Sequence, residues 1–292
     1  MLTEKIKGFI AYCKTAGFRD KSIESLSIRL NEFKKFLQQA RVRKITFIGY
    51  EHLSEFVADF GSPSIHVKKA RVWTLRQFFH YLILNGVVSE NPAKDLPYPK
   101  IERTAPKFLT IAEYNRILRY CAKRAASFIG LRNLIIVIML GVLGLRTGAL
   151  VTLNIQDVDT AAGLLWTMEK GDLRRTLVLP DVLCGILACY LERIGCPRGP
   201  LFLSKRGRRI SPRTLQEVFQ SVAAGAGVTK HLHAHLFRHT AGTHLNRIGG
   251  LNIAQYVLGH SKSRSTRTYT HLNPDNFAVY MRRHPFMKAG AR

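Results

Sequence analysis

The sequence predicts a mainly α-helical protein of two domains, with a small β-sheet in the second. Apolar residues recur at steps of three and four through much of the chain, prolines cluster near residue 100, and one later segment has the pattern of a β-hairpin. A chain of 292 residues has room for two domains, and 46% hydrophobic residues suffice for two cores. We therefore predict a helical domain over 1–96, a linker over 97–107 and a second domain over 108–292.

The first domain contains two clear helix patterns. The earlier one follows Ser22, a predicted N-cap, and has apolar residues at helical spacing: Ile23, Leu26, Leu30, Phe33 and Leu37. The later one ends before Gly86, a predicted C-cap, and repeats this spacing: Val72, Leu75, Phe79 and Leu82. Away from that stripe the later helix carries four basic residues: Lys68, Lys69, Arg71 and Arg76. This basic face is either solvated only or lies along a nucleic acid, and the four residues are candidate DNA contacts.

Prolines mark the end of the first domain. Four of them lie close together: Pro92, Pro97, Pro99 and Pro106. Each proline lacks a backbone donor and biases the residue before it toward extended structure, so a helix cannot run through this stretch. The composition predicts a semi-rigid linker.

Helices open and close the second domain. A capping box at Thr110–Glu113 starts one helix. The apolar run 133–145 is shorter than the about 20 residues that cross a bilayer, and it predicts a buried helix. Ser211 and Pro212 fit the N-cap and first position of another helix, which reaches Ala224, and further helices follow.

The strand signal is concentrated in one hairpin. Segments 164–168 and 176–179 are rich in apolar and β-branched residues, and they flank a polar tip at 169–172. This arrangement predicts two antiparallel strands joined by that tip.

The net charge restricts the class of partner. The chain has 45 Lys and Arg against 19 Asp and Glu, a formal charge of +26. So basic a surface attracts a polyanion, most commonly a nucleic acid. An anionic membrane surface is the rival partner, but the sequence shows neither a lipidation signal nor a lone basic amphipathic helix. We expect DNA and no membrane.

Cysteine usage and the N-terminus indicate the compartment. The five cysteines are irregularly spaced and form no C-x-x-C pair, which favours a reducing environment. The first residues, Met1–Lys5, begin no apolar segment of the kind that a secretion signal needs. We expect a cytoplasmic protein.

One stretch combines arginine, histidine and tyrosine without carboxylates. No Asp or Glu occurs between 218 and 274, a range that contains His235, Arg238, His260 and Tyr269. Arginine can grip two phosphate oxygens and keeps its charge, and a phenol beside it can attack the phosphate. Magnesium-like ions require carboxylates, so this stretch favours phosphate chemistry without a metal ion.

Other readings of the two candidate arginines stay open at this point. Arg146 follows the apolar run and suits phosphate binding, or it only ends a helix and extends to water. Near Arg238, His235 and His239 are four apart, a spacing that zinc ligands use. However, Leu236 stands where the H-E-x-x-H motif has its glutamate. We expect no metal and no other cofactor.

These residues resemble the tyrosine site-specific recombinases, the family of Xer-type recombinases and phage integrases. Five short motifs occur in the family's order: Gly144-Leu145-Arg146, Glu169-Lys170-Gly171, His235 with Arg238, Leu258-Gly259-His260, and Tyr269-Thr270-His271 nine residues after His260. Each motif alone is weak, but their order and spacing together are specific. The resemblance covers nearly the whole chain, and the first domain is similar to the family's helical, SAM-like core-binding domain.

The resemblance implies a catalytic set and a role for each member. Tyr269 would attack the scissile phosphate and hold the DNA through a 3′-phosphotyrosyl link, so that neither ATP nor metal is needed. Three residues would hold the phosphate oxygens: Arg146, Arg238 and His260. Lys170 would protonate the departing 5′ oxygen, and His235 would exchange a proton with the tyrosine.

Two positions depart from the family pattern. Ala149 stands where an acid is frequent, and Leu236 stands where aspartate often follows the first histidine. Neither position breaks a bond itself, so these departures affect the orientation of neighbouring groups.

The resemblance also implies partners. It predicts double-stranded DNA core sites and a homotetramer on two duplexes, alone or with a paralogous recombinase, associated with the nucleoid. The C-terminal segment 277–292 would either pack on its own domain or dock on a neighbouring protomer. Two other functions remain possible on the sequence: a nicking and resealing enzyme like type IB topoisomerases, and a catalytically silent DNA-binding regulator.

Overall fold

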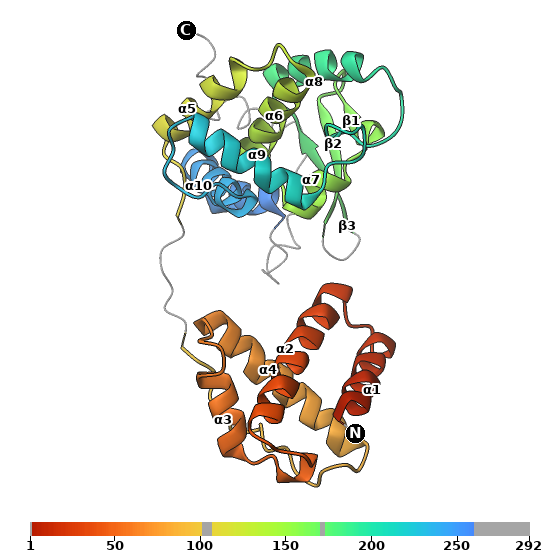
Figure 1. Cartoon of the computed structure of the whole chain (residues 1–292). Coiled ribbons are helices and arrows are strands. Elements are labelled where there is room, and N and C mark those ends of the chain that lie inside the picture. The colour runs from red at the N-terminus through yellow and green to blue at the C-terminus, as the bar shows by residue number, and fades with distance from the viewer. Residues whose placement is uncertain (1, 101–106, 170–172, 260–292) are drawn as a thin grey trace. The chain divides into compact units, whose positions relative to one another are not determined.

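The computed structural model describes residues 2–100, 107–169 and 173–259 (Figure 1). Contacts within the chain divide it into two compact units, Met1–Thr104 and Ala105–Arg292. Helices dominate the described residues, and these contain one three-stranded sheet, so the predicted fold class is confirmed. The finer limits of the domains and the linker remain predictions. No helix in the described part of the chain is long and apolar enough to cross a membrane.

The first unit is a group of helices around an aromatic core. Its elements are α1 (Leu2–Thr15), α2 (Asp20–Gln39), the short 3-10 helix η1 (Ile45–Phe47), α3 (Tyr50–Ala58) and α4 (Ile65–Leu84). The predicted apolar positions of α2 and α4 are all buried. Phe33 of α2 lies 5.0 Å from Phe56 of α3 and 6.5 Å from Phe79 of α4, measured between ring centroids. These ring contacts hold α2, α3 and α4 together.

Of the two helix ends predicted in this unit, the C-terminal end of α4 is confirmed and the N-terminal end of α2 is wrong. Gly86 has a φ of +63°, and the N–H groups of Gly86 and Val87 donate to the Ile83 and Leu82 carbonyls, so the glycine ends α4 as predicted. The N-cap prediction for Ser22 is wrong. The helix α2 begins at Asp20 with Arg19 as its N-cap, which leaves Ser22 inside the first turn. An aspartate in that turn favours the earlier start because it faces the positive end of the helix dipole.

The second unit contains six α-helices and the sheet among its described residues. Its elements are α5 (Ile111–Ala122), α6 (Phe128–Ile138), the π-helical turn η2 (Met139–Leu143), α7 (Thr147–Thr152), the 3-10 turn η3 (Ile155–Asp157), β1 (Val158–Asp159), β2 (Leu164–Glu169), β3 (Leu173–Val178), α8 (Asp181–Ile194), α9 (Pro212–Gly225) and α10 (Ala234–Leu258). The predicted buried apolar helix is α6 with η2, and the predicted helix after Ser211 is α9. A backbone break at Gly250, with φ +76° and ψ 178°, divides α10 into two segments.

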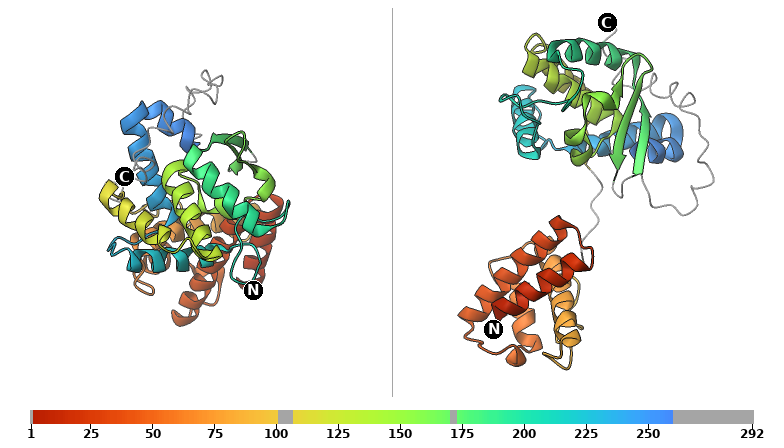
Figure 2. Two further views of the ribbon diagram at one scale, coloured as in Figure 1. Left: turned by 90° about the horizontal axis from the view of Figure 1, so that it is seen from above. Right: turned by 90° about the vertical axis from the view of Figure 1, so that its right-hand side faces the viewer.

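The predicted hairpin is confirmed as β2 and β3. The sheet is antiparallel in the order β1-β2-β3, and Leu165 and Thr167 of β2 lie opposite Leu177 and Arg175 of β3. Leu165 and Leu177 are buried, so this face of the sheet packs on the core. The side view in Figure 2 shows α10 behind the strands. The hairpin tip, 170–172, lies outside the described residues.

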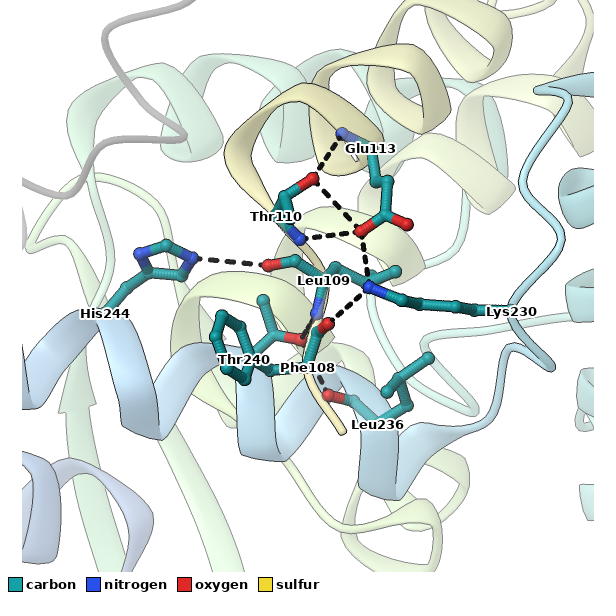
Figure 3. A network of polar contacts seen from close by, with 8 residues as sticks. All are labelled: Phe108, Leu109, Thr110, Glu113, Lys230, Leu236, Thr240 and His244. Carbon is teal, nitrogen blue, oxygen red and sulfur yellow. Dashed lines mark hydrogen bonds and ion pairs between the residues drawn. The ribbon is translucent and has the colours of Figure 1, made fainter. Parts of the chain in front are cut away.

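The start of the second unit is bonded to α10 (Figure 3). The predicted capping box is present, because Thr110 and Glu113 exchange hydrogen bonds between side chain and backbone. One residue earlier, the Leu109 N–H donates to Thr240 Oγ1 of α10 at 2.8 Å. Lys230 Nζ donates to the Phe108 carbonyl at 2.8 Å and pairs with Glu113 at 2.7 Å. Hydrogen bonds to other parts of the second unit therefore fix the position of three consecutive residues, 108–110.

Candidate active site

Arg238 is a buried arginine in the second turn of α10, with 6% of its surface exposed. Its Nη1 donates to the Gly144 carbonyl at 2.7 Å, and its Nη2 donates to the Leu258 carbonyl. These two bonds use two of the five guanidinium donors, and they fix the orientation of the planar group.

Gly144 is the residue that lets η2 end against α10. Its φ of +62° is a left-handed conformation that glycine adopts without strain. A Cβ atom at this position would lie 2.3 Å from Leu258 Cδ2, which is far inside van der Waals contact. The glycine therefore permits both the turn and the close approach that bring its carbonyl to Arg238.

Arg146 follows this turn and lies beside the same helix end. It is the N-cap residue of α7, is partly exposed, and its Nη2 donates to the Gly259 carbonyl at 3.4 Å. The turn at Gly144 and the end of α10 thus bring together two arginines that are far apart in the sequence. The predicted pairing of Arg146 with Arg238 corresponds to this geometry.

Arg175 of β3 is a third arginine at the same place, and our sequence analysis missed it. Its Nη1 lies 3.5 Å from the Tyr256 carbonyl, at the long limit of a hydrogen bond. The carbonyls of Tyr256, Leu258 and Gly259 each face one of the three arginines. The carbonyls at the C-terminal end of a helix carry partial negative charge, so they offset part of the positive charge here.

The three guanidinium groups influence one another. The pKa of Arg238 is lowered to about 10, first by burial and then by the positive charges of Arg146 and Arg175. The pKa of Arg175 is also lowered to about 10, first by burial and then by Arg146, whereas Tyr256 opposes the shift. A pKa of about 10 still leaves Arg238 and Arg175 charged at neutral pH, and the site concentrates positive charge that a phosphate can neutralise.

A group of histidines flanks Arg238 in the first turns of α10. His235 is exposed in the first turn, and His233 is the N-cap residue whose Nδ1 accepts from the Leu236 N–H at 3.2 Å. The pKa values of His233 and His239 are lowered, first by burial and then by neighbouring histidines. Over the described ranges, no group of three or more His, Cys, Asp or Glu residues is arranged to hold a metal ion.

Three members of the predicted catalytic set lie outside the described residues: Lys170, His260 and Tyr269. One described range ends at Glu169, directly before Lys170, and the next ends at Gly259, directly before His260. Glu169 is the last residue of β2, and Gly259 accepts the bond from Arg146. The structure therefore places Arg146 and Arg238 together and His235 on the same helix as Arg238.

The candidate DNA contacts on α4 divide into two pairs. Lys69 is exposed and Lys68 partly exposed, so both are available for a phosphate. Arg71 is 3% exposed, and its guanidinium donates to the carbonyls of Phe56 and Phe60 and to Glu32. Arg76 is partly buried and donates to the carbonyls of Ala93 and Leu96.

The structure thus gives both arginines of α4 a role inside the first unit. Glu32 and the Phe56 carbonyl accept hydrogen bonds from Arg71. The carbonyls of Ala93 and Leu96 accept those of Arg76. We remove Arg71 from the proposed DNA contacts because its donors face inward. The basic residues around Arg71 in the sequence do not indicate that its side chain is buried.

Both departures from the family pattern are buried apolar residues. Ala149 of α7 is 7% exposed, and Leu236 of α10 is 3% exposed. Leu236 belongs to the hydrophobic core of the second unit, and neither side chain has a polar group that could orient a catalytic neighbour.

Comparison with known proteins places this geometry in context. The profile described as "Phage integrase family" matches residues 107–276. Tyrosine recombinase XerC of Serratia marcescens is 35% identical over 225 residues, which cover 75% of this chain and 73% of that protein. Tyrosine recombinase XerC of Yersinia pestis is 33% identical over the same shares.

Solved structures show the same fold. A lambda integrase dimer bound to a COC′ core site matches with a TM-score of 0.72 at 18% identity, covering 90% of this chain and 96% of that one. The XerH recombinase bound to difH substrate, a pre-cleavage complex, matches with a TM-score of 0.69 at 23% identity, covering 94% of this chain and 83% of that one.

Proposed function

Because the chain belongs to the phage integrase family, we propose that it is a tyrosine recombinase that cuts and rejoins DNA at specific sites. The observation that carries this proposal is the convergence of Arg146 and Arg238 on the end of α10, one residue before His260. Two fixed guanidinium groups can hold the non-bridging oxygens of a phosphodiester, where negative charge grows during cleavage.

The reaction assigns one role to each residue of the catalytic set. The Tyr269 oxygen attacks phosphorus, a phosphotyrosyl bond forms, and the bond to the 5′ oxygen breaks. Lys170 gives its proton to that leaving oxygen, while His235 takes the phenol proton. Arg146, Arg238 and His260 hold the oxygens of the phosphate. Attack of a 5′ hydroxyl on the phosphotyrosyl bond reverses these steps and rejoins the strand.

A phenol needs help to react at neutral pH, because its ordinary pKa is about 10. A phenolate is favoured near positive charge. The arginine cluster of Arg146, Arg175 and Arg238 provides that charge through side chains, which supports a reaction without a metal cofactor.

The substrate we propose is double-stranded DNA with a short core site. The net charge of +26 and the exposed lysines of α4, Lys68 and Lys69, support binding to its phosphates. Similar solved structures include a lambda integrase tetramer bound to a Holliday junction. By analogy we propose four protomers on two duplexes, in the cytoplasm and at the nucleoid, with identical subunits or with a paralogue.

Neither alternative function gains support. The relatives found are named as recombinases and integrases, and the arginine pair that a silent regulator could lose is in place. An enzyme of the type IB topoisomerase kind would relax supercoils without pairing two sites. A relaxation assay run beside a two-site recombination assay separates these reactions.

Covalent capture tests the proposal. The wild-type protein is trapped on genomic DNA, the trapped ends are sequenced, and a nicked suicide substrate is built from the site found. Tyr269→Phe should bind this DNA and form no adduct on a denaturing gel, because it lacks the nucleophilic oxygen. Tyr280→Phe is the matched control and should form the adduct. An adduct from Tyr269→Phe would exclude Tyr269 as the nucleophile.

A further inference from the structure

One face of α4 leaves an aromatic ring and basic side chains uncovered. His66, Lys69 and Trp73 follow one another at steps of three and four, so they share a face of the helix. This face lies away from the one that buries Leu75 and Phe79 in the core of the first unit. Trp73 is 37% exposed, and tryptophan is among the residues most enriched in binding surfaces.

A second aromatic ring lies beside this face. A hollow of about 670 Å³ is lined by five residues of the first unit: His66, Lys69, Ala70, Trp73 and Tyr98. Tyr98 is 41% exposed. Pockets of about 300–1,000 Å³ accept small molecules or parts of larger ones. The indole of Trp73 and the phenol of Tyr98 therefore border one space that is large enough for a ligand.

Neighbouring side chains hold both rings in place. The Arg76 guanidinium lies 4.7 Å from the centre of the Tyr98 ring, and Arg76 itself donates to two backbone carbonyls at 3.2 and 2.8 Å. The centres of the Trp73 and Phe18 rings are 6.4 Å apart, with 23° between the ring planes. Rings that are fixed in advance lose little conformational entropy when a ligand stacks on them.

The charge around the hollow restricts the class of ligand. Lys69 is exposed, Lys68 precedes it on the helix, and none of the five lining residues is acidic. Cations beside aromatic rings suit a flat group that is joined to negative charge, and a nucleotide combines a base with a phosphate. In a duplex the neighbouring base pairs cover the faces of each base, so only an unpaired base can stack on these rings.

We propose that Trp73 and Tyr98 form a binding site for an unpaired base of a DNA strand, and that Lys69 contacts the phosphate of that nucleotide. The inference rests on the proposed function and refines it, because a cut strand must separate from its complement before it joins another duplex. Stacking on aromatic rings accepts any base, since every base has flat faces. A base that is stacked in this site does not pair again with its original complement.

Tryptophan fluorescence measures this stacking, because the chain has two tryptophans, Trp73 and Trp166. In the full chain with Trp166→Phe, the emission comes from Trp73 alone. An oligothymidylate of about ten nucleotides should quench this emission, and a duplex of equal length should quench it at least about 3-fold less. A strand of equal length without bases has the same phosphates, so it separates stacking from charge attraction, and it should also quench at least about 3-fold less.

Variants of Tyr98 give the second measurement, the anisotropy of a labelled oligothymidylate at a salt concentration that suppresses binding through phosphates alone. Tyr98→Ala should weaken binding by about 5–150-fold, the range that corresponds to the stacking of one base. Tyr98→Phe keeps the ring and should bind within about 3-fold of the wild type. Tyr50→Ala is the matched control with unchanged binding, because Tyr50 is 47% exposed in the same unit and does not line the hollow.

Three results would overturn the inference: equal quenching by the strands with and without bases, equal quenching by the duplex, or unchanged binding by Tyr98→Ala. The comparison of strands with and without bases is repeated by anisotropy on the wild-type protein, so the test stands even where a variant fails to fold. The covalent adduct is measured separately on the suicide substrate. An adduct without base stacking would overturn this inference alone, whereas stacking by a protein that forms no adduct would refute the proposed function.

Discussion

Arg71 in the first unit and Arg238 in the second are both buried arginines on helices, but their acceptors differ. Arg71 donates to Glu32 and to two carbonyls, and its guanidinium lies 4.4 Å from the centre of the Phe56 ring. Arg238 donates to two backbone carbonyls, and its nearby side chains include two more arginines.

The difference separates an arginine that serves the fold from one that we propose binds a phosphate. The carboxylate of Glu32, which also pairs with Arg29, offsets the charge of Arg71 within the fold. Carbonyls offset only part of the charge of Arg238, and like charges around it raise the free energy of the empty site. A phosphate relieves that repulsion. Burial alone therefore does not indicate function, whereas burial among like charges does.

The largest expected effect is on the rate of DNA cleavage. Arg238→Lys should lower the rate of covalent adduct formation by about 10²–10³-fold, because a single ammonium cannot contact two carbonyls and a phosphate as a planar fork does. Single-turnover cleavage on the suicide substrate measures this. The comparison would fail if Arg238→Lys cleaved normally, or if its loss of activity followed only from unfolding.

The next effect is on stability and should be confined to the first unit. Arg71→Met removes the donor of the Phe56 and Phe60 carbonyls and leaves Glu32 with Arg29 as its remaining partner. We expect a loss of about 2–4 kcal/mol in the free energy of unfolding, measured by urea denaturation of the full chain. The rate of cleavage at saturating DNA should stay near that of the wild type under native conditions. A loss of cleavage rate as large as that of Arg238→Lys would contradict the distinction between Arg71 and Arg238.

A smaller effect concerns DNA affinity. Lys69→Gln should reduce the slope of log Kd against log salt by about one unit, because each neutralised phosphate releases its counterions. Lys68→Gln gives a second test on the same helix. Fluorescence anisotropy with the captured site measures both slopes, and unchanged slopes would remove these lysines from the DNA interface.

The smallest effect is on the pH dependence of stability. Burial lowers the pKa of His244, opposed by a hydrogen bond to the Leu109 carbonyl, and burial also lowers the pKa of His233 and His239. Below an ordinary pKa of about 6.5 the unfolded chain takes up protons first, so stability falls as the pH is lowered from 7.5 to 5.5. His244→Gln should make that fall in the melting temperature shallower. An equal or steeper fall would assign the pH dependence to other groups.

Local patterns in the sequence predicted much of the fold. The stripe of α2, the capping box at Thr110 and the hairpin each depend on residues a few positions apart, and all three were confirmed. The start of α2 was missed because Ser22 and Asp20 are competing signals within one turn.

The candidate site required contacts between distant residues. The resemblance selected Arg146 and Arg238, but it gave no account of Arg71, whose partner Glu32 is 39 positions away. Arg175 was open to detection, since it alternates with Leu177 of the same strand and with Leu179 directly after the strand, and both leucines are buried. Because strand residues alternate between two faces, a charged residue at an inward-facing position can be recognised from the sequence pattern alone.

The attachment of residues 108–110 to α10 has a mechanical consequence. Chain tension applied from the N-terminal side would first meet Phe108 and Leu109, whose bonds lead to Lys230 and to Thr240, two residues beyond Arg238. The load would therefore be delivered to the helix that carries Arg238. Strain from a bent or stretched duplex could in this way reach the cleavage chemistry along the polypeptide itself.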